Sequence, residues 1–357
     1  MECSRNITNL PVEILDLLFK YCGDMTNKLH LAQTHPYLVE AFAYHCRNLF
    51  ECISNDKEIS LSSWRFILPV CGSNIKTIHK NIRDSSDEEL VNLVALHCSK
   101  LEKIKLSFET DSVDCVKSLI CQRQNSLKAI RLILMLRSES RELNTKMLHE
   151  FPELPLLEEL KITNIPIENY DHIQKFKNLV KLEIGCWGLT KHVIDVFALC
   201  APLKKLQILF LRGVRIIASE QTKIHLPVLQ LKKLSITCEQ HNSHAEVQRF
   251  ILSQGKSLES LRYDCELVSY SNEDFLEVIR ICRSLRICML PVQDFIFDLE
   301  CVEEILVILR QNGVTEDNPF LLVPLDLFDR YEEVVELLKC SSSPELIIPC
   351  ILSLLDN

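Results

Sequence analysis

The feature that most constrains this chain is an apolar pattern, L-x-x-L-x-L, that recurs along most of its length. Complete copies, some with Ile, Cys or Tyr in place of Leu, begin at Leu101, Leu127, Leu157, Leu179, Leu206, Leu231, Leu258 and Leu285, and a partial copy begins at Ile75. The mean period of about 26 residues is typical of arrays in which each repeat contributes a strand and then a helix or turn. One such repeat cannot bury its apolar face alone, so the pattern predicts a stacked array with a continuous core.

Two further features support this register. Small polar or thiol side chains stand seven residues after the first Leu of four copies, at Asn164, Cys186, Cys238 and Cys265. Such side chains suit the turn that ends a strand, because they can satisfy backbone groups there. Serines expected to cap helices precede several strands by 14 or 15 residues, with an acid three positions later, at Ser86, Ser243 and Ser271. Ser112 has the same phase without the acid.

The first fifty residues do not follow the repeat and predict three short helices. Pro11 suits the start of the first helix, Gly23 its end, Asp24 or Asn27 the cap of the second and Pro36 the start of the third. The apolar side chains of the first helix cover an arc of about 220°, against about 100° for a one-sided surface helix. This helix therefore has to bury two faces, one of them against the following domain or against another protein.

The block Leu10-Pro11-Val12-Glu13-Ile14-Leu15, followed by Leu18-Phe19-x-Tyr21 and Leu29-x-x-Ala32, resembles an F-box over residues 7–50. The resemblance implies docking to the Skp adaptor of Skp–cullin–F-box ubiquitin ligases, and through it to a cullin. By position, the implied adaptor-binding residues are Leu10, Pro11, Ile14, Leu15, Leu18, Phe19, Leu29 and Ala32. The third helix departs from the family, offering Tyr37 and Phe42 where a Trp is common. The alternative is a helical cap on the next domain.

The repeats in turn resemble the leucine-rich repeats that follow the F-box in one large F-box family. The fold class expected is α/β, with an N-terminal three-helix F-box followed by a curved leucine-rich-repeat solenoid, its parallel strands on the concave face and its helices outside. The expected domains are an F-box at 1–50, a linker at 51–73, the repeat array at 74–325 and a C-terminal cap or tail at 326–357. A helix from Asp329 to Lys339 is expected to cover the last repeat, and a partner-binding tail is the alternative.

Composition argues against several classes of function. The net charge of −9 disfavours nucleic acid as a ligand, and only 7 glycines with no GxGxxG or P-loop pattern disfavour dinucleotide folds. Seventeen cysteines without a CxxC pair, and no apolar leader, predict a reduced cytoplasmic or nuclear protein without a membrane span. Its cysteines are expected to be mostly small buried side chains. We expect no cofactor and no metal, because the metal-like cluster Cys238-x-x-His241-x-x-His244 overlaps the expected helix start at Ser243.

No catalytic signature occurs, so we expect a non-catalytic protein. Residues 84–89, an acidic run with two serines, resemble a kinase site, but the expected cap at Ser86 explains the same pattern. The exposed position between the second and third apolar residues carries a cation in three successive copies, at Lys105, Arg131 and Lys161. This column predicts a dock for an acidic or phosphorylated substrate segment, with a simple solvated face as the alternative.

These features together favour the substrate-recognition subunit of a Skp–cullin–F-box ubiquitin ligase that binds an unknown protein substrate. The alternative is a leucine-rich-repeat scaffold that binds a partner without ubiquitin-ligase activity.

Overall fold

The computed structural model describes residues 6–55, 59–135, 147–165, 167, 171–186, 192–217, 229–238, 244–265, 271–290, 296–324 and 331–349. The chain divides into two compact units, Met1–Leu157 and Glu158–Asn357. Each is a mixed α/β unit built on parallel strands. No helix of the described part has the length and apolar character needed to cross a membrane.

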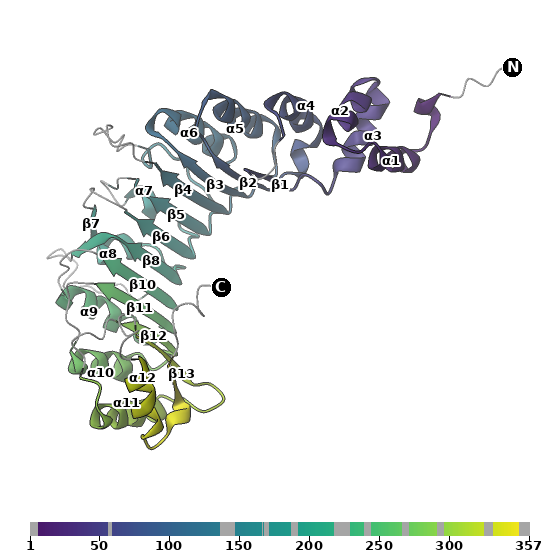
Figure 1. Ribbon diagram of the computed structural model, residues 1–357. Helices are drawn as coiled ribbons and strands as arrows, with labels where there is room; N and C mark the ends of the chain where they lie inside the picture. The colour runs from purple at the N-terminus through teal and green to yellow at the C-terminus, as the bar shows by residue number, and fades with distance from the viewer. Residues whose placement is uncertain are drawn as a thin grey trace. The chain divides into compact units, whose positions relative to one another are not determined.

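The first unit begins with helices and continues as strand–helix repeats. A short 3₁₀ turn, η1 (Ile7–Asn9), precedes α1 (Val12–Tyr21), α2 (Met25–Gln33) and α3 (Pro36–Cys46). The repeats then follow as β1 (Cys52–Ser54), α4 (Leu61–Cys71), β2 (Thr77–Asn81), α5 (Ser85–His97), β3 (Lys103–Phe108), α6 (Val113–Gln122) and β4 (Ala129–Leu134). Strands β1 to β4 pair in chain order, all parallel, and α4, α5 and α6 lie on one side of them (Figure 1).

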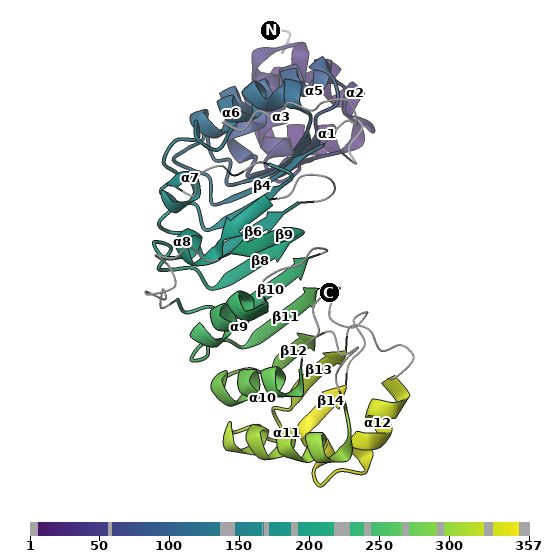
Figure 2. The ribbon, with the colours of Figure 1, turned by 90° about the vertical axis from the view of Figure 1, so that its left-hand side faces the viewer.

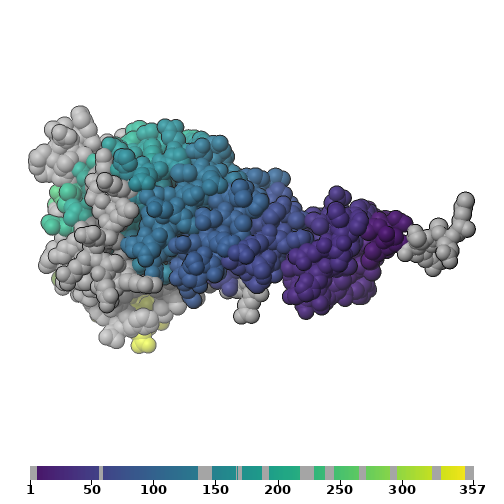
Figure 3. All heavy atoms as spheres, turned by 90° about the horizontal axis from the view of Figure 1, so that it is seen from above, coloured from purple at the N-terminus to yellow at the C-terminus, as the bar shows by residue number. Residues whose placement is uncertain are grey.

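The caps of the first three helices explain their boundaries. Gly23, at φ +71°, lies just after α1 in a conformation that other residues adopt at a cost. The Asp24 carboxylate then accepts a hydrogen bond from the backbone N–H of Asn27 at 2.8 Å, which caps α2 as expected. His35 caps α3 and Pro36 occupies its first position. In the space-filling view the described residues of these three helices form a compact group of atoms (purple in Figure 3).

The second unit continues the same alternation of strands and helices (Figure 2). Its elements are β5 (Glu159–Thr163), α7 (Asp171–Gln174), β6 (Lys181–Gly185), β7 (His192–Asp195), α8 (Val196–Cys200), β8 (Ile208–Arg212), β9 (Val214–Ile217), β10 (Lys233–Cys238), α9 (His244–Ser253), β11 (Ser260–Cys265), α10 (Asn272–Ile281), β12 (Ile287–Leu290), α11 (Leu299–Gln311), β13 (Phe320–Pro324), α12 (Tyr331–Lys339) and β14 (Ile347–Pro349). The main sheet runs in the order β5-β6-β8-β10-β11-β12-β13-β14. Strands β7 and β9 form a separate parallel pair that the repeat pattern did not predict.

The strand register confirms the repeat pattern. Equivalent apolar positions lie opposite one another across neighbouring strands, as in the row Leu182, Leu209, Leu234, Leu261 and Cys288. Every side chain of this row is at most 1% exposed. In the first unit Ile78, Ile104 and Ile130 form the same kind of row. The core is therefore the stack of repeat positions, as the sequence predicted.

The expected domain boundaries require two corrections. Residues 51–73 are not a linker, because β1 pairs with β2 and α4 packs along α5 with Trp64 and Ile67 buried. Their described part, β1 and α4, has the strand and helix of a repeat, and β1 is too short to display the apolar pattern. At the other end the sheet continues beyond residue 325, because β14 pairs with β13. The helix expected before it is present as α12, and residues 325–330 lie outside the described part.

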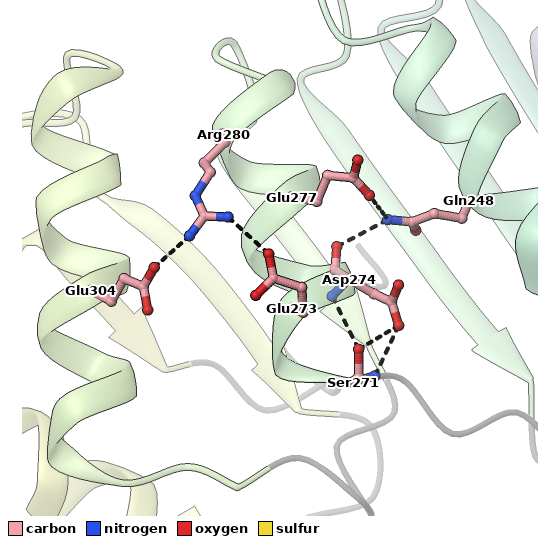
Figure 4. Close-up of polar contacts among 7 residues, drawn as sticks. All are labelled: Gln248, Ser271, Glu273, Asp274, Glu277, Arg280 and Glu304. Carbon is pink, nitrogen blue, oxygen red and sulfur yellow. Dashed lines mark hydrogen bonds and ion pairs between the residues drawn. The ribbon is translucent and has the colours of Figure 1, made fainter.

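The expected helix caps are confirmed at one serine and corrected at two. Ser271 caps α10 and forms a complete capping box with Asp274, as drawn in Figure 4. Asp84, not Ser86, caps α5, since its carboxylate accepts from the amides of Ser86 at 2.9 Å and Asp87 at 3.0 Å. Ser112 precedes α6, but its hydroxyl donates to the Glu88 carboxylate at 2.7 Å. Ser243 lies outside the described residues.

Polar side chains also connect α9, α10 and α11 (Figure 4). The Gln248 amide of α9 donates to the Asp274 carbonyl at 3.0 Å and to the Glu277 carboxylate at 3.3 Å. Arg280 of α10 pairs with Glu304 of α11 and, at 3.2 Å, with Glu273. Exposed ion pairs contribute about 0–1 kcal/mol each, so these contacts align helices that the apolar core already holds together.

We predict a large loss of stability for Gly213→Ala. Gly213 has φ +64°, and an added Cβ would lie 2.0 Å from the backbone oxygen of Cys186 in the neighbouring repeat. The left-handed backbone alone costs about 1–2 kcal/mol for an L-residue, and relief of the clash requires backbone movement. We expect a loss of about 2–3 kcal/mol in the free energy of unfolding, measured by denaturant titration. Gly23→Ala is the matched control, because Gly23 has φ +71° and nothing within 4 Å; an equal loss in both variants would contradict the clash.

Candidate functional site

Helix α1 presents large apolar side chains to solvent along one side. Ile14, Leu17 and Tyr21 are 44%, 46% and 87% exposed, and Pro11 is exposed at the start of the helix. Their spacing of three or four residues places these four side chains on one face. We call Pro11, Ile14, Leu17 and Tyr21 the α1 stripe. Leu10 and Leu18 border it and are half-buried.

The opposite face of α1 packs against α3. Leu15 is 1% exposed and Phe19 fully buried. The Phe19 ring meets the Phe42 ring edge-on at 5.7 Å between centroids and stacks on the His45 ring at 5.6 Å. The first helix thus has two apolar faces, as its 220° arc predicted, and only one of them is covered by this unit.

Four of the eight implied adaptor-binding residues do not lie on this exposed face. Leu15, Phe19, Leu29 and Ala32 are all buried within the packed helices and offer no surface to a partner. Two residues of the α1 stripe, Leu17 and Tyr21, were absent from that set. The signal that could have found them is the helical spacing from Ile14, which Leu17 and Tyr21 continue at three and seven residues.

A polar cluster holds α1 in this orientation. The Asp16 carboxylate of α1 lies 2.8 Å from Nδ1 of His45 on α3, and Nε2 of His45 lies 3.1 Å from Nζ of Lys28 on α2. Both contacts are satisfied when Nδ1 carries the proton and donates to Asp16 while Nε2 accepts from the lysine. In addition, the Tyr37 hydroxyl donates to the Leu10 carbonyl at 3.1 Å. All three helices are thereby joined, which keeps the α1 stripe pointing outward.

The same cluster predicts a dependence of stability on pH. Hydrogen bonds from Lys20 and His45 lower the pKa of Asp16 below its ordinary 3.8. A carboxylate with a depressed folded-state pKa contributes stability above its unfolded pKa and loses it as the pH falls through the folded value. The stability difference between the native chain and Asp16→Asn should therefore be larger at pH 5 than at pH 2, and it should shrink as the pH falls below about 4. Thermal unfolding across this range measures it, with the exposed Glu13→Gln as control; a difference that persists at pH 2 would contradict the assignment.

The predicted cationic column is only partly formed. Lys105 and Arg131 lie opposite each other on β3 and β4, with His79 of β2 on the other side of Lys105. Lys161, in the second unit, is instead paired with Glu183, at 2.6 Å between Nζ and Oε1. The Glu183 carboxylate also lies 3.4 Å from Nε of Arg212 and is only 5% exposed. Lys161 is thus already paired with an acid of this chain, and its expected role in binding an acidic segment stays a prediction.

Most of the cysteines whose side chains the structure describes are buried, while Cys121 and Cys340 are exposed. Burial raises the pKa of Cys98 to about 12 and of Cys301 to about 11, so both thiols stay protonated at neutral pH. The described residues contain no group of three potential metal ligands. The side chains of the predicted metal-like cluster, Cys238, His241 and His244, all lie outside the described part of the structure.

Comparison with known proteins places the chain by fold alone. No family model matches it, and neither does any curated protein. Among solved structures 51 chains match. One of them, from the crystal structure of the Rad7 and Elc1 complex in yeast, is 12% identical, with 96% of this chain and 92% of that chain covered and a TM-score of 0.55. The likeness shows a shared fold of strand–helix repeats.

Proposed function

We propose that this chain is the substrate-recognition subunit of a Skp–cullin–F-box ubiquitin ligase. In this proposal α1 to α3 are the F-box and dock the Skp-type adaptor, and the strand–helix repeats are leucine-rich repeats that bind a protein substrate. The observation that carries it is the α1 stripe, a solvent-exposed apolar face on a helix whose other face is already packed. The chain performs no covalent chemistry itself and acts by holding the substrate near the conjugating enzyme.

The energetics of the stripe favour a protein partner. Burial of a large apolar side chain stabilises a complex by about 1.5–3 kcal/mol, and an exposed tyrosine such as Tyr21 is a residue type enriched at binding hot spots. Association costs at least about 4 kcal/mol, so the stripe needs additional contacts around it to bind stably. Ile7, 40% exposed in the turn before α1, extends the apolar surface in the direction of the chain start.

The comparison adds support of a general kind. The similar yeast chain comes from a crystal of a two-protein complex, Rad7 with Elc1. A repeat fold of this type therefore occurs in an assembly with a second protein.

The proposal is tested by mixing the purified full chain with a Skp-type adaptor and a cullin at micromolar concentration. We expect the three proteins to elute together in size-exclusion chromatography. Separate elution of the chain would refute the proposal. Co-elution without ubiquitin transfer to any protein bound by the repeats would favour the non-catalytic scaffold instead.

A further inference from the structure

The helix-free face of β1 to β4 has an unusual charge. Its outward positions alternate with the buried ones and are Cys52, Ser54, Thr77, His79, Asn81, Lys103, Lys105, Ser107, Ala129, Arg131 and Ile133. These eleven residues, which we call the β1–β4 open face, include three permanent cations and one histidine but no Asp or Glu. The chain as a whole carries a net charge of −9, so the positive charge of this face is opposite in sign to the charge of the whole chain.

The three cations of the open face have no acidic partner among the residues that the structure describes. Lysines beside this face behave differently, since Lys80 lies 2.8 Å from Asp87 and Lys128 lies 3.0 Å from Glu102. Lys103, Lys105 and Arg131 therefore concentrate positive charge on one face without an ion pair to any described acid.

The second unit provides an internal comparison. Its outward sheet positions, unlike those of the first unit, include the acids Glu159, Glu183 and Asp264, and two of its cations are paired with them. Lys161 pairs with Glu183, and Arg262 lies 3.3 Å from Asp264. Outward cations without any acid on the same face are thus a property of the β1–β4 open face and not of the described strands of the second unit.

The geometry of the cations favours carboxylates on an extended chain. Lys103 and Lys105 are two residues apart on one strand, about 7 Å, and Lys105 and Arg131 are opposite each other on strands about 4.8 Å apart. An extended peptide places alternate side chains at the same spacing of about 7 Å. The backbone N–H groups of these strands are used in the sheet ladder, so the face offers no backbone nest of the kind that holds a phosphate group.

We propose that the β1–β4 open face binds an extended, carboxylate-rich segment of a partner protein through Lys103, Lys105 and Arg131. The inference deepens the proposed function, on which it rests for the identification of that partner as the substrate. His79 flanks the cations on one side, and Ser107 and Asn81 provide neutral hydrogen-bonding groups along the same strands.

The test uses the full chain without adaptor and a fluorescent ten-residue peptide of alternating Glu and Ser. Fluorescence anisotropy should show binding that weakens as NaCl rises from 50 to 300 mM, because the contacts are screened. The triple variant Lys103→Glu, Lys105→Glu, Arg131→Glu should bind at least about tenfold more weakly. A matched control, Lys100→Glu, Lys177→Glu, Lys204→Glu, changes the net charge equally at exposed turn positions and should bind as the native chain does.

Other results would overturn the inference. Absence of peptide binding, or an equal loss in both triple variants, would remove the specific role of the open face. Tighter binding of a phosphoserine–Ser peptide of equal total charge would indicate a phosphate site instead. If the glutamate variant fails to fold by circular dichroism, the triple variant with Gln at the same three positions takes its place. None of these assays contains the adaptor, so failure here leaves adaptor docking untouched, and failure of adaptor docking leaves these results untouched.

Discussion

Replacement of both Ile14 and Leu17 by Asp is expected to abolish capture of the Skp-type adaptor. The two side chains lie at the centre of the α1 stripe, so adaptor docking would bury two carboxylates without partners. We expect the affinity to fall by at least about 100-fold, as for loss of a hot spot. Because the native side chains are 44% and 46% exposed, the fold should tolerate the change. Isothermal titration of the purified chain with the adaptor measures the loss.

The matched control places the same charges elsewhere on the chain. Leu96 of α5 and Val307 of α11 are 65% and 47% exposed. A chain carrying Leu96→Asp and Val307→Asp should bind the adaptor normally. If the double variant of α1 still captured the adaptor, or if the control lost capture to the same degree, the α1 stripe would not be the docking face.

Replacement of Phe19 by Ala is expected to destabilise the three N-terminal helices by about 3–5 kcal/mol, the usual cost of removing a buried phenyl ring. Phe19 is fully buried, and the variant would lose its contacts with the rings of Phe42 and His45. The effect should be local, because repeat arrays transmit stability mainly between neighbours. Hydrogen exchange of the α1 to α3 amides measures it directly.

Leu17→Ala is the control for this experiment, since an exposed apolar side chain on the same helix should change stability by less than about 0.5 kcal/mol. The pair also decides between two roles of Phe19. A Phe19→Ala chain with native exchange rates but weakened adaptor binding would return Phe19 to the docking face that the F-box resemblance implied.

The repeat region shows how far a sequence pattern reaches. Every complete copy of the pattern coincides with a strand of the main sheet. The reason is that a strand with one buried face has apolar and polar residues in alternation. The first repeat escaped detection because β1 spans only Cys52–Ser54, too short for the pattern. The β7–β9 pair escaped because the L-x-x-L-x-L template describes only the main-sheet strand of each repeat.

The candidate site was less accessible to such reasoning. The sequence placed eight residues on the adaptor face, but a helix with two apolar faces contains no internal sign of which face its own chain covers. The sequence also contained Glu183, the residue that follows Lys161 in the column. Only the register of β5 and β6 shows that its carboxylate lies against Lys161.

The sequence by itself determined the periodic architecture, since local alternation and spacing are properties of neighbouring residues. Only the tertiary structure decided which apolar and charged side chains remain available to a partner, because exposure and ion pairing depend on residues brought together from distant repeats. Phe19 and Ile14 differ little as apolar residues of one helix, and it is the packing of α3 against one of them that separates core from surface.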